Sequence, residues 1–363
     1  MSRATRITLI EPYYGGSHRR WIDGYRKHSR HTIDLLTMPA QFWKWRMQGG
    51  AVTLANQFNA LAEKPDLLII SDMLDISTFR ALTRTEIPIV LYFHENQLTY
   101  PQNRRQHHGW RYGFINYTSA LTADTVLFNS AFHHDDFFTE LPRMLKHFPD
   151  YTELDTIETI RAKSHVLPLG IDLARFNQHN SMRNSDTPLI LWNHRWEADK
   201  NPAAFVDALL TLASEGFDFE VAIAGRNFRQ HPTEFEQLRA QLGERVIHYG
   251  YTKSFADYAR LLWQADYIIS PSYQDFFGIA VTEAIYCQCV PLLANRLNYP
   301  HLIPNDYHAQ CLFRDGALTG LLRQHLLGNL SVDTAQLRTY VAQYDWQHII
   351  TRYDDTFATL ASQ

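Results

Sequence analysis

The sequence predicts two α/β domains, each a doubly wound parallel sheet with helices on both faces. Three observations predict this: a length of 363 residues, a composition with 45% hydrophobic and 20% charged residues, and short apolar stretches that alternate with helical ones. At roughly 100 to 200 residues per domain, the length indicates about two domains. Repeated strand–helix units of this kind form parallel sheets covered on both faces.

The first half of the chain contains six short apolar stretches, which we predict to be strands at residues 8–10, 32–36, 66–71, 87–94, 125–129 and 165–167. Helical spacing of apolar residues predicts helices at 17–28, 52–63, 110–121 and 133–139. Gly15 and Gly16 form the first strand-to-helix turn. Residues 177–187 are polar and lack an apolar period, so we expect a domain over 1–176 followed by a linker over 177–187.

The second half repeats the pattern over 188–345. Strands are expected at 189–192, 219–224, 246–248, 267–270 and 290–293, and helices at 203–215, 233–242, 255–264 and 278–286. Residues 346–363 have one apolar helical stripe and are expected to form a C-terminal helix that packs back on the first domain.

Several classes of protein are disfavoured by what the sequence lacks. No apolar stretch approaches the roughly 18 to 20 residues of a membrane span. The three cysteines have no C-x-x-C spacing and fit a reducing, cytoplasmic location. The motifs G-x-G-x-x-G and G-x-x-x-x-G-K-[ST] are absent, which argues against a dehydrogenase or a P-loop kinase. No D-x-D triplet occurs, and the adjacent side chains of 133–136 would diverge on a helix, so we predict no metal site and no cofactor.

The most informative stretch runs from Pro271 to Ala284 and reads strand end, loop with Asp275, Gly278, then a helix with Glu283. The unpaired N–H groups at the start of that helix favour a diphosphate. Asp275 and Glu283 would lie about 12 Å apart along a helix, so they fit two parts of one long ligand better than a shared bond. A helix-capping acid and a solvent-facing glutamate are the alternative interpretation.

Basic and polar residues follow other predicted strands. Arg195 and Lys200 come after the first strand of the second domain, where they would neutralise charge on a diphosphate leaving group. His94 ends the strand 87–94 and is followed by Glu95 and Asn96, so we expect it to hydrogen-bond a sugar hydroxyl at the sheet edge. Surface charges and structural hydrogen bonds are the alternatives.

The charge is uneven along the chain. Residues 1–111 carry 15 lysine and arginine residues against 9 acidic ones, a balance of +6, whereas the whole chain carries −4. Aromatic and basic residues alternate in this part, namely Trp43, Trp45, Arg46, Arg104, Arg105, His107, His108, Trp110 and Arg111. Unpaired RNA bases stack on aromatics while arginines pair with phosphates, so this region is a candidate RNA surface; a solvated charged face is the alternative.

The second domain resembles that of the retaining family-4 glycosyltransferases of GT-B fold, in which two Rossmann-like domains face each other across a cleft. Arg195 and Lys200 match the basic pair of that family and Glu283 its second acid, while Asp275 stands where the family usually has Glu. The resemblance implies donor-binding roles for these four residues. It also implies such roles for Gly15, Gly16, Gly225, Gly250, Phe277 and Gly278.

A narrower resemblance is carried by EPYYGGSH (11–18), FWKWR (42–46), FHENQLTYP (93–101), FNSAF (128–132) and HRWEADKNP (194–202). These stretches are similar to the tRNA-queuosine α-mannosyltransferases, which use GDP-mannose as donor and the cyclopentene diol of queuosine in tRNA-Asp as acceptor. The resemblance implies His94, Arg195, Lys200 and Asp275 as catalytic residues. From the aromatic-basic clusters and the polar residues beside His94, we expect the acceptor near Trp43, Trp45, Arg46, Glu95, Asn96, Arg104, Arg105 and Arg111.

We therefore expect a retaining, metal-independent hexosyltransferase that moves mannose from GDP-mannose to queuosine in tRNA. Its partners are then a nucleotide sugar as co-substrate and a queuosine-containing tRNA, without a membrane. Three alternatives remain open at this point: a family-4 transferase with a lipid, glycan or small-molecule acceptor, a non-catalytic RNA-binding protein of the same fold, and a sugar-nucleotide epimerase.

Overall fold

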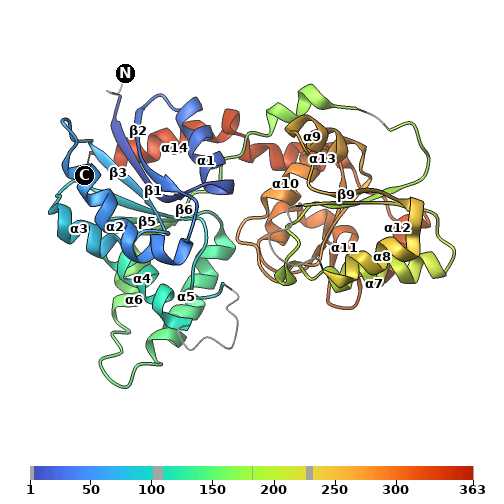
Figure 1. Ribbon diagram of the computed structural model, residues 1–363, viewed down its shortest axis with the longest axis horizontal. Coiled ribbons are helices and arrows are strands. Elements are labelled where there is room, and N and C mark those ends of the chain that lie inside the picture. Colours follow the sequence, from blue (N-terminus) through green and yellow to red (C-terminus); the bar gives the residue numbers. More distant parts are fainter. Residues whose placement is uncertain (1–3, 101–108, 182, 226–231, 363) are drawn as a thin grey trace. The chain divides into compact units, whose positions relative to one another are not determined.

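The computed structural model describes residues 4–100, 109–181, 183–225 and 232–362. The chain divides into two compact units (Figure 1). Unit 1 combines residues 1–171 with residues 346–363, and unit 2 comprises residues 172–345. The polar stretch 177–187, in which we expected a linker, therefore lies within unit 2, and the chain passes between the units at Ile171 and Asp172.

Unit 1 contains a six-stranded parallel sheet of order β2-β1-β3-β4-β5-β6. Its strands are β1 (Arg6–Tyr14), β2 (Thr32–Pro39), β3 (Leu67–Ser71), β4 (Ile89–Phe93), β5 (Thr125–Phe128) and β6 (Ser164–Val166). Its helices are α1 (Gly16–His28), α2 (Trp43–Asn59), α3 (Ile76–Thr83), α4 (Gly109–Thr122), α5 (Ala131–Leu145), α6 (Thr156–Ala162) and α14 (Trp346–Leu360).

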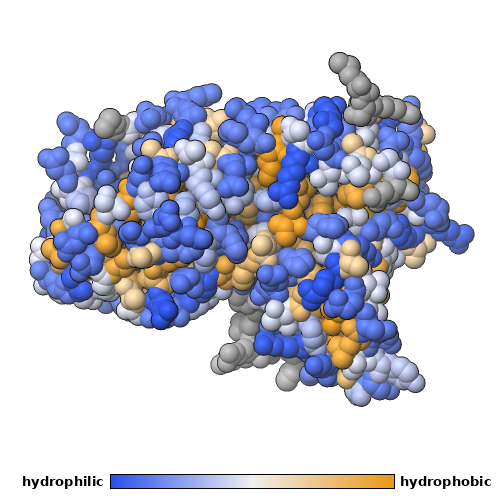
Figure 2. All heavy atoms as spheres, turned by 180° about the vertical axis from the view of Figure 1, so that it is seen from behind, coloured by the Kyte–Doolittle hydropathy of each residue, from blue (hydrophilic) through white to orange (hydrophobic). Residues whose placement is uncertain are grey.

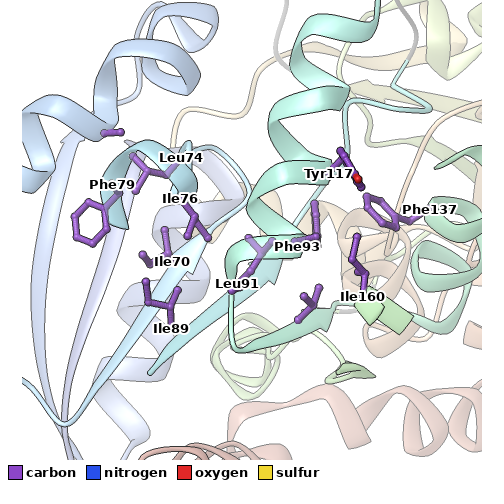
Figure 3. Packing of buried hydrophobic residues seen from close by; sticks show 14 of the residues in the cluster. Ile70, Leu74, Ile76, Phe79, Ile89, Leu91, Phe93, Tyr117, Phe137 and Ile160 are labelled. Carbon is purple, nitrogen blue, oxygen red and sulfur yellow. The ribbon is translucent and has the colours of Figure 1, made fainter. Parts of the chain in front are cut away.

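Hydrophobic burial on both faces explains the apolar strands of unit 1. Every residue of β3 and β4 is buried. On one face their side chains pack against α2 to α6, and Figure 3 shows Leu91 and Phe93 facing Tyr117 of α4 and Phe137 of α5. Local signals fix the helix starts, since Asp75 accepts from Thr78 N at 3.0 Å before α3 and Ser130 accepts from His133 N at 3.0 Å before α5.

Helix α14 completes unit 1 beside α1 (Figure 1). Trp346 is 1% exposed and stands against two glycines. A Cβ atom at Gly24 would lie 2.1 Å from Trp346 Nε1, and one at Gly170 would lie 2.5 Å from its Cη2. Glycine is therefore required at both positions, because any side chain would overlap the indole ring.

Unit 2 repeats the architecture with a parallel sheet of order β12-β11-β10-β7-β8-β9. Its strands are β7 (Leu189–Trp192), β8 (Glu220–Ala224), β9 (Val246–Gly250), β10 (Tyr267–Ser270), β11 (Val290–Ala294) and β12 (Leu312–Phe313). Its α-helices are α7 (Pro202–Ser214), α8 (Thr233–Leu242), α9 (Phe255–Gln264), α10 (Ile279–Tyr286), α11 (His308–Cys311), α12 (Leu318–Leu326) and α13 (Thr334–Val341). Short 3₁₀ turns are η1 (Ala174–His179), η2 (Ala198–Lys200), η3 (Gly243–Arg245), η4 (Tyr299–Leu302), η5 (Asn305–Tyr307) and η6 (Ala342–Tyr344).

The strand orders locate the ligand-binding edges. In a doubly wound sheet, ligands bind beyond the carboxyl ends of the strands where the winding changes direction. That point lies between β1 and β3 in unit 1 and between β7 and β10 in unit 2. The residues in the last part of β1 or after these strands include Glu11 to Gly16, Asp72, Asn193 to Lys200 and Pro271 to Gly278.

The predicted α/β class is confirmed, with some differences in the elements. Helix α2 begins at Trp43, nine residues before the expected 52, so the aromatic-basic stretch 43–46 is part of this helix. Helices α3, α6, α12 and α13 and strand β12 were not predicted. Among the described residues, no helix is both long and apolar enough to cross a membrane. Figure 2 shows a face of each unit on which hydrophilic residues prevail and hydrophobic ones form small groups.

Candidate active site

In unit 2, the loops after β7 and β10 are tied to each other. Lys200 is 7% exposed and its ammonium donates to the carbonyl of Gln274, the residue before Asp275. The same ammonium lies 3.2 Å from Asp199 Oδ2, and Tyr273 N donates to the carbonyl of Asp199 at 2.7 Å. The structure thus brings Lys200 and the Asp275 loop together at the expected sheet edge.

Asp275 shapes the start of α10. Its Oδ1 accepts from Gly278 N at 2.9 Å, and its Oδ2 accepts from Tyr299 OH at 3.3 Å. Gly278 has φ +97°, where a Cβ atom would lie 3.0 Å from Leu302, so glycine is required here. The first helical bond of α10 runs from Thr282 N to Gly278 O at 2.9 Å. The N–H groups of 279–281 precede it in the first turn, where helix geometry leaves such groups without intrahelical partners, as an anion site requires.

Glu283 lies in the second turn of α10 and is 2% exposed. Tyr258 OH of α9 donates to its Oε2 at 2.7 Å, and Arg175 Nη2 lies 3.6 Å from its Oε1. The Arg175 guanidinium is also placed over the ring of Phe255, 4.0 Å from the centroid. The carboxylate is therefore held by two neighbours rather than facing solvent.

The remaining predicted donor residues of unit 2 differ in exposure. Arg195 is exposed and lies 3.3 Å from Glu197 Oε2. Phe277 is buried, with its ring edge-on to Tyr344. Gly225 N donates to Gly250 O at 3.2 Å, and a Cβ atom at Gly225 would lie 2.0 Å from the carbonyl oxygen of His194. That close approach explains the glycine.

In unit 1, His94 follows β4 and is anchored through its backbone. Asp72, at the end of β3, accepts from His94 N at 2.7 Å through Oδ1. Asp72 Oδ2 and His94 Nε2 are buried and have no hydrogen-bond partner among the described residues. Leaving such groups unpaired costs about 1 to 3 kcal/mol each, so a ligand hydroxyl that reached them would recover this energy.

A buried charge network surrounds His94. The ring of His18, in the first turn of α1, lies 4.3 Å from the ring of His94, and His18 Nδ1 is 2.8 Å from Glu11 Oε2. Burial by itself lowers the pKa of His18, but Glu11 outweighs it and raises that pKa to about 9. Burial, and then the charge of His18, hold the pKa of His94 well below its usual value. Burial raises the pKa of the Asp72 carboxyl. His94 is therefore an uncharged imidazole at neutral pH.

The predicted acceptor residues occupy two places in unit 1. Glu95 Oε1 accepts from Gln97 Nε2 at 3.0 Å, and Asn96 is fully buried with its Oδ1 accepting from Leu98 N and Thr99 N. Trp43, Trp45 and Arg46 lie in the first turn of α2, where Trp45 is 62% exposed. Arg111 lies at the start of α4 and is exposed. Arg104, Arg105, His107 and His108 lie outside the described residues.

Sequence reasoning missed several residues of these two sites. Asp72 follows an apolar strand and Glu11 lies in the quoted EPYYGGSH stretch, so both could have been selected by the rule that selected His94. Tyr258 and Arg175 lie in the middle of α9 and at the start of η1, and no local pattern marks them. Among the described residues, no group of three or more His, Cys, Asp or Glu side chains could hold a metal ion.

Comparison with known proteins decides the family. Residues 6–171 match the model described as tRNA-queuosine alpha-mannosyltransferase N-terminal, and residues 175–321 match that of the glycosyl transferases group 1. The tRNA-queuosine alpha-mannosyltransferase of Drosophila melanogaster is 32% identical over 315 residues, which cover 83% of this chain and 82% of the fly protein. The chain belongs to the tRNA-queuosine α-mannosyltransferase family. Within that family, it is a group 1 hexosyltransferase that acts with retention.

More distant relatives agree on the fold. The GDP-mannose:cellobiosyl-diphosphopolyprenol alpha-mannosyltransferase of Xanthomonas campestris is 23% identical over 202 residues, 54% of this chain and 53% of that protein. Sucrose-phosphate synthase from Thermosynechococcus elongatus superposes with a TM-score of 0.72 at 14% identity over 99% of both chains. A glycosyltransferase from Rickettsia africae gives 0.69 at 16% identity over 98% of both chains. This member of the queuosine mannosyltransferase family therefore has the GT-B fold.

Proposed function

We propose that this chain transfers mannose from GDP-mannose to the cyclopentene diol of queuosine in tRNA, with tRNA-Asp as the preferred tRNA. Membership of the family supports the mannosyl transfer and the tRNA substrate. The mannose donor named for the Xanthomonas relative supports GDP-mannose. Three buried free cysteines fit a reducing compartment, and we place the reaction in the cytoplasm.

The observation that carries the proposed mechanism is the contact of Lys200 with the carbonyl of Gln274. It fixes a buried cation beside the start of α10, where a diphosphate would meet the N–H groups of 279–281. Negative charge grows on the diphosphate as its bond to the sugar breaks, and a preorganised cation stabilises that charge without a metal. Arg195, exposed at the same loop, adds a second positive charge.

The reaction balances without a protein nucleophile. The bond between the anomeric carbon and the phosphate oxygen breaks, and the acceptor hydroxyl attacks the same face. Its proton passes to the phosphate oxygen that departs. We assign Glu283 to the ribose and Asp275 to the hexose of the donor, because they lie in successive parts of the α10 segment. His94, uncharged and with Nε2 buried, would bind a hydroxyl of the reacting sugars.

The test is an assay of purified protein with bulk tRNA and one sugar nucleotide at a time. We expect nucleoside mass spectrometry to find queuosine plus one hexose with GDP-mannose, and no product with UDP-glucose or with tRNA that lacks queuosine. EDTA should leave the rate within about twofold. Labelling of a lipid fraction in place of tRNA would refute the proposal, and loss of activity with EDTA that manganese restores would refute the metal-free mechanism.

A further inference from the structure

A pocket of about 490 Å³ lies in unit 1, and none of the residues assigned above to catalysis lines it. Its wall includes Trp110, Phe114 and Phe148 together with Gln48, Asp75 and Arg111. Phe114 is 41% exposed and Phe148 is 37% exposed, and their ring centroids lie 5.7 Å apart. Pockets of this size hold small ligands, and exposed aromatic rings in a polar surface mark a site of interaction.

The pocket lies where three helices begin. Gln48 belongs to the second turn of α2, Asp75 is the N-cap of α3, and Arg111 belongs to the first turn of α4. These helices follow β2, β3 and β4, so their first turns lie at the carboxyl edge of the sheet, the edge that also carries His94.

Helix α4 connects the pocket to the surroundings of His94. Asn116, on this helix, donates from Nδ2 to the carbonyl of Asp72 at 2.9 Å, and its Oδ1 accepts from Gln97 N at 2.8 Å. Both partners flank His94 in the structure, since Asp72 holds its backbone N–H and Gln97 follows it in the same loop. The pocket is thus fixed relative to the candidate acceptor edge of unit 1.

The polar groups of the pocket suit a planar heterocycle. The Arg111 guanidinium donates to Gln48 Oε1, and Gln48 Nε2 donates to Tyr112 OH at 2.9 Å, so the fork of Arg111 is held in place. The carboxylate of Asp75 already accepts two hydrogen bonds from Thr78, one from the backbone N at 3.0 Å and one from Oγ1 at 2.7 Å. An oriented guanidinium beside aromatic rings offers donors to a base edge or a phosphate, and the rings offer faces for stacking.

The charges nearby favour an anionic partner. Lys44 and Arg46 are partly or fully exposed on α2, and Lys146 is exposed next to His147, whose ring lies 6.0 Å from Trp110. Within the pocket wall itself, Arg111 is the basic residue, and Asp75, which already caps α3, is the acidic one. We propose that this pocket binds an unpaired nucleobase from the tRNA loop that carries the acceptor. The proposal rests on the proposed function, which names tRNA as the acceptor.

The test compares RNA binding by Phe114→Leu/Phe148→Leu with binding by the parent chain. Leucine keeps an apolar side chain and removes the ring, so the variant should stay folded, which thermal unfolding checks. Leu82→Ala is the matched control, because Leu82 is 48% exposed on α3 and does not line the pocket. We expect the double variant to bind an anticodon stem-loop about tenfold more weakly, with the same dependence on salt, since stacking releases no counterions.

A second measurement identifies the base. Each unpaired nucleotide of the hairpin is replaced in turn by an abasic one, and affinity is measured for the parent and for the double variant. At one position, the abasic replacement should weaken binding to the parent about tenfold and leave binding to the double variant unchanged. The base and the two rings are partners in one contact, so removing either partner already removes that contact. A fully paired hairpin of equal length should bind parent and variant equally.

Equal affinity of both proteins for the hairpin, or abasic effects that simply add to the effect of the variant, would overturn this inference and leave the rings as a surface for a protein partner. Failure of the proposed function looks different. In that case the parent would bind the hairpin through this pocket and still form no mannosyl-queuosine.

Discussion

His18 Nδ1 lies 2.8 Å from Glu11 Oε2 in the interior of unit 1, where Glu11 is fully buried and His18 is 6% exposed. A buried imidazole normally loses its charge, because burial disfavours the charged form. Here the contact with Glu11 outweighs the effect of burial, so that the pKa of His18 is raised to about 9. The pair therefore places a fixed positive charge 4.3 Å from the ring of uncharged His94.

The first prediction concerns stability and pH. Because the pKa of His18 is about 9 in the folded chain and about 6.5 when unfolded, the pair stabilises fully below pH 6.5 and loses its effect as pH rises through 9. Glu11→Gln should lower the free energy of unfolding by up to about 3 kcal/mol at pH 6 and by clearly less at pH 9.5. Urea unfolding at several pH values measures this. Asp23→Asn, which changes an exposed carboxylate of α1, is the control. If Glu11→Gln lowered the free energy of unfolding equally at every pH, the raised pKa of His18 would be contradicted.

The second prediction concerns Tyr258, which holds the carboxylate of Glu283. Tyr258→Phe removes one hydrogen bond to a charged group, worth about 1.5 to 3 kcal/mol, and should weaken GDP binding about tenfold or more. Isothermal titration calorimetry with GDP is the measurement. Tyr286→Phe removes a hydroxyl bonded to Asn177 at 3.2 Å and should leave GDP affinity unchanged. Unaltered GDP binding by Tyr258→Phe, alongside a loss in Glu283→Ala, would show that Tyr258 does not position the carboxylate.

The third prediction separates the two acids of the α10 segment. Glu283→Ala should weaken GDP binding by about 1 to 3 kcal/mol, whereas Asp275→Asn should leave GDP affinity nearly intact and reduce turnover strongly. Asparagine can still accept from Gly278 N, so this variant tests the charge rather than the loop. GDP titration and single-turnover assays would measure both. Equal losses of GDP affinity in Glu283→Ala and Asp275→Asn would disprove the assignment of the two acids to different parts of the donor.

The fourth prediction concerns the leaving group. Arg195→Ala and Lys200→Ala should lower kcat more than they raise the KM for tRNA, because in the proposed mechanism both side chains stabilise charge that grows only as the donor bond breaks. Lys200→Arg keeps the positive charge on a side chain of different shape. This variant should therefore retain more of kcat than Lys200→Ala does. Steady-state kinetics with tRNA as the varied substrate decide this. A change confined to the KM for tRNA would point to acceptor binding instead.

The fifth prediction concerns the contact of α14 with the rest of unit 1. Trp346→Ala should destabilise unit 1 by about 3 to 5 kcal/mol, the usual cost of removing a buried large aromatic side chain. Gly170→Ala should also destabilise it, since the new methyl group would overlap the indole ring. Thermal unfolding measures both changes. Trp45→Ala, at a position 62% exposed, should leave the melting temperature within about 2 °C.

The elements that the sequence predicted best are those in which local pattern and tertiary packing agree. Tyr267–Ser270 and Phe255–Gln264 match the expected bounds, because β10 is a buried apolar run and α9 begins at a Ser254 cap. The start of α2 could not be read from the sequence: its cap, Phe42, adopts φ 51°, unusual for a bulky residue, and Gly49 and Gly50 interrupt the helical pattern.

Site residues divide in the same way. Lys200 and Asp275 could be proposed from the sequence because they lie in the loop regions after β7 and β10, and the structure brings these loops together. Tyr258 and Arg175 act on Glu283 from other elements, and contacts between distant elements leave no trace in local spacing. The pKa of His18 depends in the same way on the burial of Glu11, which only the folded sheet determines.

The discontinuity of unit 1 has a consequence for how the chain is made. Residues 1–171 leave the ribosome before unit 2, yet the side chains of Trp21 and Tyr25 are covered by Tyr353 and Trp346 of α14. Every residue of unit 2 is synthesised before that helix exists. Domains generally fold as units during synthesis, so unit 2 can fold at once, while the earlier part of unit 1 keeps an open aromatic face until α14 emerges. The sheet of unit 1 is thus synthesised before that of unit 2 but reaches its final packing after it.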